Sequence, residues 1–318
     1  MGGVLRIGTR DSQLAVWQAT LVQNLLKEAG TESELVYIKS EGDVDTVTPL
    51  YALGVQGIFT KTLDAALLSG RIDIAVHSMK DVPTILAQGI QQAAVLRRAS
   101  YKDIFVYKNG SVIQEWQLDK AAKISPVPIE GVIATSSIRR IAQWLHRYPQ
   151  HTIENLRGNV NTRLRKVAES NWNGAIFAAA GLERINVRPQ NSIDLDWMLP
   201  APAQGAIMVV SRTSDEAALN ACKSFNDAET ALCTKIERDF LHTLMGGCST
   251  PISALATVQN GEVLLKGNIC SRDGVQMQEI EATEKTENAE GLGIRAANQL
   301  LQHPTAQQIM TNIRNAKG

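Results

Sequence analysis

No apolar run in the 318-residue sequence approaches the roughly 20 residues that a helix needs to cross a bilayer. Signal-peptide features are missing as well, because Met1-Gly2-Gly3 leads directly into the strand-like segment 4–7. Low-complexity tracts and internal repeats are also missing, which excludes a disordered or fibrous chain. We therefore expect a cytoplasmic globular protein with no membrane partner.

Cysteine is scarce. The four cysteines are Cys222, Cys233, Cys248 and Cys270, and no two of them form a CxxC pair or stand near a histidine at metal-ligand spacing. Disulfide frameworks are rare in cytosolic proteins of this size, so we expect neither structural disulfides nor a metal site. A single cysteine could still act alone as a reactive thiol.

A net charge of one sign is absent too, because 32 Lys and Arg residues balance 32 Asp and Glu residues. A neutral chain argues against a general nucleic-acid surface, so no nucleic-acid partner is expected. Basic residues are nevertheless concentrated between residues 139 and 166, where Glu154 is the only acid: Arg139, Arg140, Arg147, Arg157, Arg163, Arg165 and Lys166. This local excess predicts binding of a small polyanion.

The length exceeds the usual size of one hydrophobic core, so two or three domains are expected. Strand and helix patterns alternate over residues 1–100 and again over 103–199, which predicts two doubly wound α/β domains with helices on both faces of a parallel sheet. The strands are expected at 4–8, 35–38, 72–76, 132–134, 151–156 and 174–180, and the helices at 14–26, 60–69, 138–147 and 162–170.

The C-terminal part has a different pattern. A helical stretch over 215–244 precedes strand-like segments at 252–258, 262–268 and 275–282 and a closing helix at 290–301. This order predicts a smaller α+β domain. We place the first domain at 1–100 and 203–217, the second at 103–199 and the third at 218–318, with a mobile loop at 40–57.

The polar residues that stand out in both α/β domains follow predicted strands. They are Arg10 and Ser12, the segment 78–81, the segment 135–140, and the segment 157–163. Ligands of open α/β sheets bind beyond the carboxyl ends of the strands, so these four clusters predict an anion site between two lobes. The simpler alternative is that the arginines are surface residues on capped, solvated helices.

Two further residues could carry chemistry. Asp81, among expected cations, could stay ionised and stabilise a cationic intermediate or pass a proton to a leaving amine, although a helix-capping role is an alternative. His77 beside it is expected to pack or hydrogen bond. Cys248 follows Gly246-Gly247 and precedes Pro251, which predicts an accessible thiol on a loop, whereas the other three cysteines are expected in cores.

Six motifs together resemble the porphobilinogen deaminase family, in the family's order and over nearly the whole chain. They are the IGTRxSxLAxxQ segment at 7–18, HSMKDVP at 77–83, TSSxRR at 135–140, LRGNVxTR at 156–163, AGLxR at 180–184 and GGCxxP at 246–251. The resemblance implies three domains, of which the first two fold like two-lobed periplasmic binding proteins. It also implies a monomer.

The resemblance further implies a transferase that condenses porphobilinogen molecules head to tail with loss of ammonia, on a dipyrromethane cofactor attached to Cys248. Asp81 would be catalytic. Other cofactor contacts would come from Ser78, Lys80, Thr135, Ser137, Arg139, Arg140, Arg163 and Arg184. Substrate contacts would come from Arg10, Ser12, Lys61, Arg157 and Gln204.

The sequence departs from the family's pattern at two positions. Gln56 stands where a lysine is frequent, which weakens one loop contact with a polyanion although Lys61 keeps a nearby cation. Ala134 replaces a glycine before the TSS segment. A non-enzymatic two-lobed anion-binding protein stays open as the alternative function, as does a cysteine-dependent hydrolase.

Overall fold

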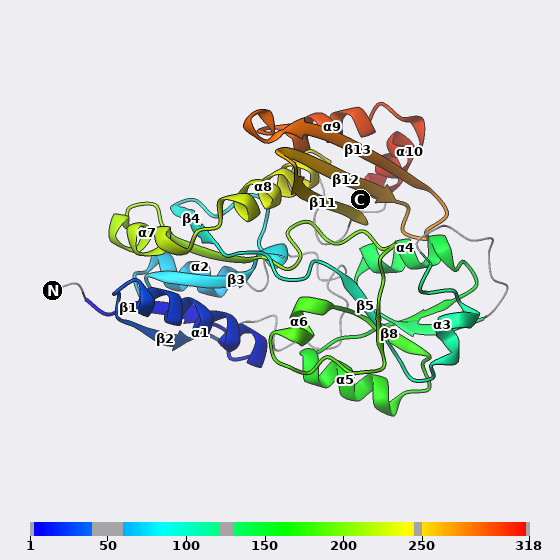
Figure 1. Cartoon of the computed structure of the whole chain (residues 1–318), viewed down its shortest axis with the longest axis horizontal. Coiled ribbons are helices and arrows are strands. Elements are labelled where there is room, and N and C mark those ends of the chain that lie inside the picture. Colours follow the sequence, from blue (N-terminus) through cyan, green and yellow to red (C-terminus); the bar gives the residue numbers. More distant parts are fainter. Residues whose placement is uncertain (1–2, 40–59, 121–129, 245–249, 316–318) are drawn as a thin grey trace. The chain divides into compact units, whose positions relative to one another are not determined.

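The computed structural model describes residues 3–39, 60–120, 130–244 and 250–315. Described residues 3–39, 60–99 and 204–232 form one compact unit, and those from 100 to 203 and from 233 onward form a second (Figure 1). Within the described ranges, no helix has both the length and the apolar character needed to cross a membrane.

The first unit is built on a five-stranded sheet with the order β2-β1-β3-β10-β4. Its strands are β1 (Leu5–Thr9), β2 (Ser33–Tyr37), β3 (Ile74–Ser78), β4 (Ile90–Val95) and β10 (Ile207–Arg212). The other elements are α1 (Gln13–Glu28), α2 (Lys61–Leu68), α7 (Glu216–Cys222) and the short 3-10 helices η2 (Met79–Asp81) and η3 (Lys223–Phe225).

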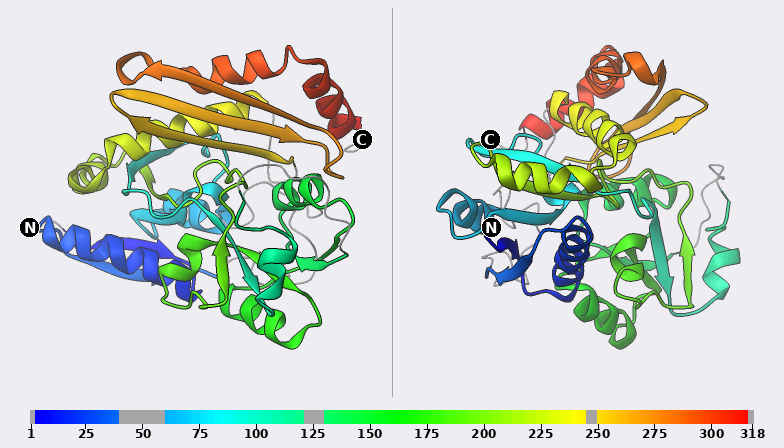
Figure 2. Two further views of the ribbon diagram at one scale, coloured as in Figure 1. Left: turned by 45° about the vertical axis from the view of Figure 1, so that its right-hand side comes forward. Right: turned by 60° about the vertical axis from the view of Figure 1, so that its left-hand side comes forward.

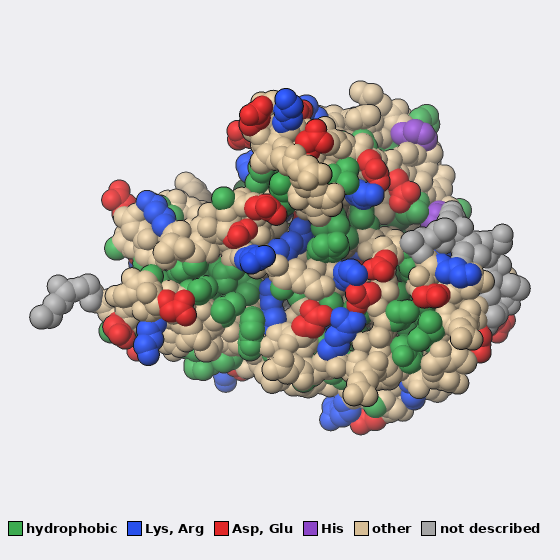
Figure 3. All heavy atoms as spheres, in the orientation of Figure 1, with side chains coloured by type: hydrophobic (Ala, Val, Ile, Leu, Met, Phe, Trp, Pro, Cys, Tyr) green, Lys and Arg blue, Asp and Glu red, His purple; other side chains and the backbone are tan. Residues whose placement is uncertain are grey.

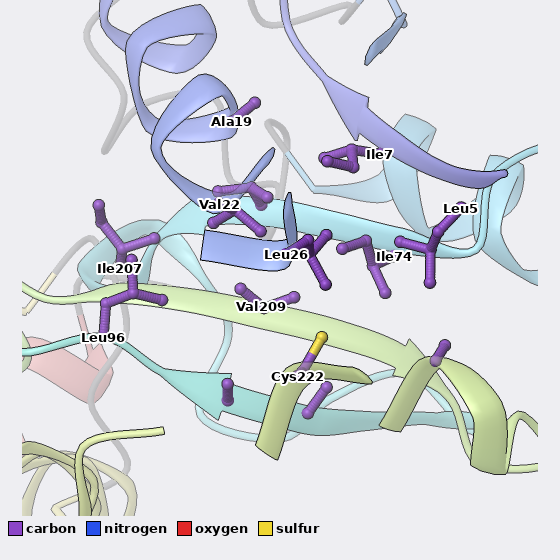
Figure 4. Close-up of a cluster of buried hydrophobic side chains, with 14 residues drawn as sticks. Leu5, Ile7, Ala19, Val22, Leu26, Ile74, Leu96, Ile207, Val209 and Cys222 are labelled. Atoms are coloured by element: carbon purple, nitrogen blue, oxygen red, sulfur yellow. The ribbon is translucent and has the colours of Figure 1, made fainter. Parts of the chain in front are cut away.

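Apolar side chains on α1 and α7 explain why these helices cover one face of this sheet. Val22 and Leu26 of α1 and Cys222 of α7 are fully buried against Ile74 and Val209 of the strands (Figure 4). Helix α2 contacts β1, β3 and β10. Its buried residues Leu63 and Leu67 are not part of the cluster of apolar side chains to which α1 and α7 contribute. The predicted doubly wound design is confirmed.

The second unit contains a sheet of the same design, with the order β7-β6-β8-β5-β9. Its strands are β5 (Asp103–Tyr107), β6 (Val132–Ala134), β7 (Thr152–Glu154), β8 (Gly174–Ala178) and β9 (Ser192–Asp194), and its helices are α3 (Ser111–Glu115), α4 (Ile138–Arg147), α5 (Val160–Glu169) and α6 (Ala179–Glu183). Two separate cores pack on its strands, one with α3 and α4 and the other with α5 and α6. This arrangement also matches the predicted fold class.

Neither five-stranded sheet is wholly parallel. In the first, β10 runs antiparallel to both β3 and β4, and in the second, β5 runs antiparallel to both β8 and β9. The expectation of purely parallel sheets was therefore incomplete. Each antiparallel strand pairs with partners distant in the sequence, and local alternation of strand and helix carries no information about such pairing.

A three-stranded antiparallel sheet, β11-β12-β13, occupies the C-terminal part of the second unit. The elements of the chain from residue 228 onward are α8 (Ala228–Thr243), β11 (Ile252–Gln259), β12 (Glu262–Cys270), β13 (Met277–Lys285), the 3-10 helix η4 (Thr286–Asn288), α9 (Leu292–Leu300) and α10 (Pro304–Asn315). Helices α9 and α10 lie along this sheet in Figure 2. The expected α+β character is confirmed, while the three domain limits stay a prediction.

Charged side chains of both signs are interspersed over the face of the molecule seen in Figure 3. This pattern agrees with the net charge of zero.

The predicted helical stretch at 215–244 is in fact divided into α7, η3 and α8. Two expectations, the loop at 40–57 and the Cys248 loop, lie outside the described residues.

Candidate active site

A pocket opens in the first unit where the carboxyl ends of β1 and β3 meet the start of α1. These strands are parallel neighbours, so the residues that follow them lie at the same edge of the sheet. The polar residues that line the pocket are Arg10, Ser12, Gln18, Thr60, His77, Ser78 and Asp81. Four residues predicted from the sequence, at positions 10, 12, 78 and 81, are thus brought together.

Asp81 is the last residue of the 3-10 turn η2, which follows β3 directly. The turn is anchored by Met79, which is 1% exposed, whereas the Asp81 side chain is exposed toward the pocket. The next element along the chain is the strand β4, so Asp81 caps no helix. The capping alternative is therefore wrong.

Ser12 has two roles at the pocket. It is the N-cap of α1, and its Oγ accepts a hydrogen bond from the Ala15 backbone N–H at 3.4 Å. The free N–H groups and the positive end of a helix favour an anion at this place. Arg10 lines the same pocket from the preceding loop, so the two residues together fit a carboxylate.

Ser78 is held by Gln18 of α1. Gln18 is 2% exposed, and its Nε2 lies 2.9 Å from Ser78 Oγ while its Oε1 lies 3.2 Å from the same atom. Gln18 is a pocket residue that closes the first of the six motifs, but the sequence interpretation gave it no role at the site. Its signal was present, because a polar residue stands among Leu14, Leu21 and Leu25 on the apolar face of the predicted helix.

Lys80 and Gln204 form a pair beside this site. Lys80 Nζ donates a hydrogen bond to Gln204 Oε1 at 3.2 Å, and the Gln204 backbone carbonyl accepts one from Arg98 Nε at 2.8 Å. Gln204 is 1% exposed, so its amide is fixed by the protein. Lys61 is the first residue of α2 and is exposed next to Thr60 of the pocket.

In the second unit, the predicted residues gather where β6 and β7 end. Ser137 is the N-cap of α4, which begins at Ile138 as expected, and the Ser137 N–H donates to Thr135 Oγ1 at 3.3 Å. Ser136 connects the two strand ends, because its Oγ donates to the Leu156 carbonyl at 2.6 Å and accepts from the Leu156 N–H at 3.0 Å.

Arg139 and Arg140 are 5% and 6% exposed, so the alternative of surface arginines is wrong for both. Their common partner is Asp103, a fully buried residue at the start of β5, which accepts from Arg139 Nη2 at 2.7 Å and from Arg140 Nη2 at 2.7 Å. Two guanidinium groups against one carboxylate leave a net charge of +1. Asp103 was not predicted, because nothing in the sequence around it indicates that it pairs with Arg139 and Arg140.

This cluster fits a bound anion. Burial lowers the pKa of Arg139, and its Nε is buried without a hydrogen-bond partner in the part of the chain that the structure describes. A pyrrole pair with carboxylate arms would compensate both the unbalanced charge and the unused donor.

The remaining arginines lie around the same sheet edge. Arg157 is 4% exposed, and Arg163 Nε donates to the Gly158 carbonyl at 2.7 Å at the start of α5. Gly158 has φ +113°, a conformation that favours glycine. Arg184 follows α6, and burial lowers its pKa to about 10. Arg157 and Arg163 flank the turn as predicted.

Comparison with known proteins gives a consistent result. The family model described as porphobilinogen deaminase, dipyrromethane cofactor binding domain, matches residues 5–220, and the model of the C-terminal domain of the same enzyme matches residues 231–302. The chain belongs to the porphobilinogen deaminase family.

Relatives in this family are identical to the chain at more than a third of the aligned positions. Porphobilinogen deaminase of Acidithiobacillus ferrooxidans is 38% identical over 98% of this chain and 99% of its own, and that of Brevibacillus brevis is 40% identical over 94% of both. The chloroplastic enzyme of Oryza sativa is 40% identical over 88% of this chain and 78% of its own. The solved VFT2 domain of Bordetella pertussis BvgS is similar over 72% of this chain and 90% of its own, at 16% identity and a TM-score of 0.41.

Porphobilinogen deaminase is a transferase, and its cofactor is dipyrromethane. The family model of the cofactor-binding domain runs from β1 to α7 and therefore includes both five-stranded sheets. Cys248, the expected attachment point, lies outside the described residues. The expectation that the two groups of polar residues form one anion site stays a prediction.

Proposed function

We propose that this chain condenses four porphobilinogen molecules head to tail, with loss of ammonia at each step, and releases hydroxymethylbilane by hydrolysis. The observation that carries this proposal is the pocket at the ends of β1 and β3, where the exposed carboxylate of Asp81 lies with Arg10 and Ser12. Porphobilinogen carries both a group that becomes cationic and two carboxylate arms. A site with one carboxylate and an anion-binding half is complementary to it.

In this proposal Asp81 is the catalytic residue. Departure of ammonia leaves a cationic azafulvene form of the substrate, and a fixed carboxylate beside the pyrrole nitrogen stabilises the charge as it develops. Arg10 and Ser12 bind a carboxylate arm of the substrate, and we propose Lys61, Arg157 and Gln204 as further substrate contacts. Binding of the arms orients the reacting carbon and gives the reaction the advantage of proximity.

The dipyrromethane cofactor, when bound, supplies the pyrrole carbon that the first substrate molecule joins. We propose that Cys248 attaches it through a thioether. The residues that hold its carboxylate arms are Ser78, Lys80, Thr135, Ser137, Arg139, Arg140, Arg163 and Arg184. The net positive charge of the Asp103 cluster supports this assignment.

We further propose a cytoplasmic monomer that binds neither nucleic acid nor membranes. Free, buried thiols at Cys222 and Cys270 are typical of a reducing compartment and support the location. The balanced charge supports the absence of a nucleic-acid partner. Light scattering during gel filtration tests the monomer, because a mass of twice the chain would contradict it.

Substitution of Asp81 tests the proposed function. Asp81→Asn preserves the size of the side chain and removes its charge, so we expect kcat to fall by about 10²–10³-fold while the cofactor stays attached. Turnover is measured from porphobilinogen, and cofactor content is measured by intact-protein mass spectrometry.

The matched control is Asp11→Asn, which removes an exposed carboxylate next to Arg10 that does not line the pocket. This variant should keep wild-type turnover. Near-normal turnover of Asp81→Asn would remove Asp81 from the mechanism. Absence of turnover in the wild-type protein would favour the non-enzymatic anion-binding alternative.

A further inference from the structure

His77 is a pocket residue to which the mechanism above gives no role. It lies on β3 between the buried Val76 and the pocket residue Ser78, and its side chain is 6% exposed while bordering the pocket. Its Nε2 is buried and has no hydrogen-bond partner within the described part of the chain. An unsatisfied buried polar atom costs about 1–3 kcal/mol, so its retention calls for an explanation.

The charge state of this ring is fixed by its surroundings. Burial, and then the nearby positive charge of Arg10, lower the pKa of His77 to about 4. The imidazole is therefore neutral under physiological conditions, with one N–H donor and one acceptor nitrogen. A neutral ring is a poor general acid for a leaving amine, but it is a good hydrogen-bond donor to an anion.

The neighbours of His77 indicate which ligand it serves. Arg10 and Ser12 form the anion-binding half of the pocket, whereas Ser78 on the next residue of β3 is already held by Gln18. A carboxylate seated in the pocket would interact favourably with the positive charge of Arg10. It would also offer an oxygen to the unsatisfied nitrogen of His77.

We propose that His77 is a substrate-positioning residue, which donates a hydrogen bond from its neutral ring to the pyrrole-side-chain carboxylate bound at Arg10. This inference rests on the proposed function and deepens it. One carboxylate arm is then recognised by a charged donor, Arg10, together with an uncharged donor, His77. The uncharged donor adds direction without adding a second positive charge near the developing azafulvene cation.

Two substitutions separate this role from a structural one. His77→Leu removes the unsatisfied nitrogen and keeps a buried side chain of similar size, so the thermal midpoint should stay the same or rise. The KM for porphobilinogen should nevertheless rise about 10-fold or more, because a hydrogen bond to a charged group is lost. His77→Gln restores a neutral N–H donor and should return KM to within about 3-fold of wild type.

A binding measurement distinguishes failure of this inference from failure of the proposed function. The probe is a pyrrole with acetate and propionate arms but no aminomethyl group, titrated calorimetrically into the complete, cofactor-loaded protein. Weaker binding to His77→Leu than to wild type supports the role of His77 even if porphobilinogen is not turned over. Equal KM and equal probe affinity in wild type and His77→Leu would overturn the inference, as would parallel losses of stability and affinity in both variants.

Discussion

At the scale of single residues, the Asp103 cluster shows how the fold holds two arginines in its interior. Arg139 Nη1 donates to the Leu199 carbonyl at 2.8 Å and Arg140 Nη1 to the Ile176 carbonyl at 3.0 Å, in addition to their bonds to Asp103. These carbonyls satisfy donors that the single carboxylate cannot reach. The arginines are therefore fixed at the start of α4 before any ligand binds.

Removal of the shared carboxylate should be costly. Asp103→Asn leaves two buried guanidinium groups without their counter-charge, so we expect a loss of about 3–5 kcal/mol in the free energy of unfolding. Chemical denaturation followed by fluorescence measures this loss. The control is Asp196→Asn, which breaks an exposed pair with Lys102 and should cost at most about 1 kcal/mol. Equal effects of the two substitutions would show that the Asp103 cluster is not a buried ion network.

Sequence reasoning identified Arg139 and Arg140 but could not give their surroundings. The residue types and the helix start at Ser137 predicted anion donors, and the helix begins where expected. Asp103 lies 36 residues before Arg139, on a strand whose position in the sheet depends on pairing with β8 and β9. The order of strands in the sheet brings Asp103 to Arg139, and local sequence patterns do not predict that order.

At the scale of elements, the turn between β12 and β13 contacts helix α4. His146 Nδ1 of α4 lies 2.7 Å from the Gly274 carbonyl, and Gln143 Nε2 lies 2.9 Å from Ser253 Oγ of β11. The three-stranded sheet thus fixes the helix that carries Arg139 and Arg140. Gly274 has φ +74°, and a side chain there would meet the backbone of Ala142 and His146 at 2.6 Å.

A pair of glycine substitutions isolates the contribution of this contact. Gly261, in the turn between β11 and β12, has φ +80° but open space around its Cβ position. Gly261→Ala should therefore cost only the backbone strain of about 1–2 kcal/mol, while Gly274→Ala should cost clearly more in the free energy of unfolding and disturb α4. Similar costs for both variants would contradict a tight contact with α4.

The elements that sequence periodicity predicted best are those with strong local patterns. Helices α1 and α4, strands β1 and β3 and the two hairpins of the third sheet all lie close to their expected ranges. Strands β5 and β10 were not predicted, although both are apolar, because their place in the fold depends on antiparallel pairing with distant strands. Helix α10 was also missed.

At the scale of the whole molecule, the proposed activity depends on one covalent attachment. The thiols of Cys222 and Cys270 are buried, and burial raises the pKa of each to about 12, so their reactive thiolate forms are scarce. Cys233 is buried as well. These environments favour Cys248 as the attachment point. The glycines before Cys248 predicted only an accessible thiol, and its role as the attachment point was implied by the family resemblance.

The most direct test of this central claim is intact-protein mass spectrometry of the purified protein, followed by digestion and peptide mapping. We predict a mass that exceeds the sequence by one dipyrromethane, with the added mass on the peptide that contains Cys248, and its loss in Cys248→Ser but not in Cys233→Ser. A mass equal to the sequence in an active preparation, or added mass on another cysteine, would contradict the account.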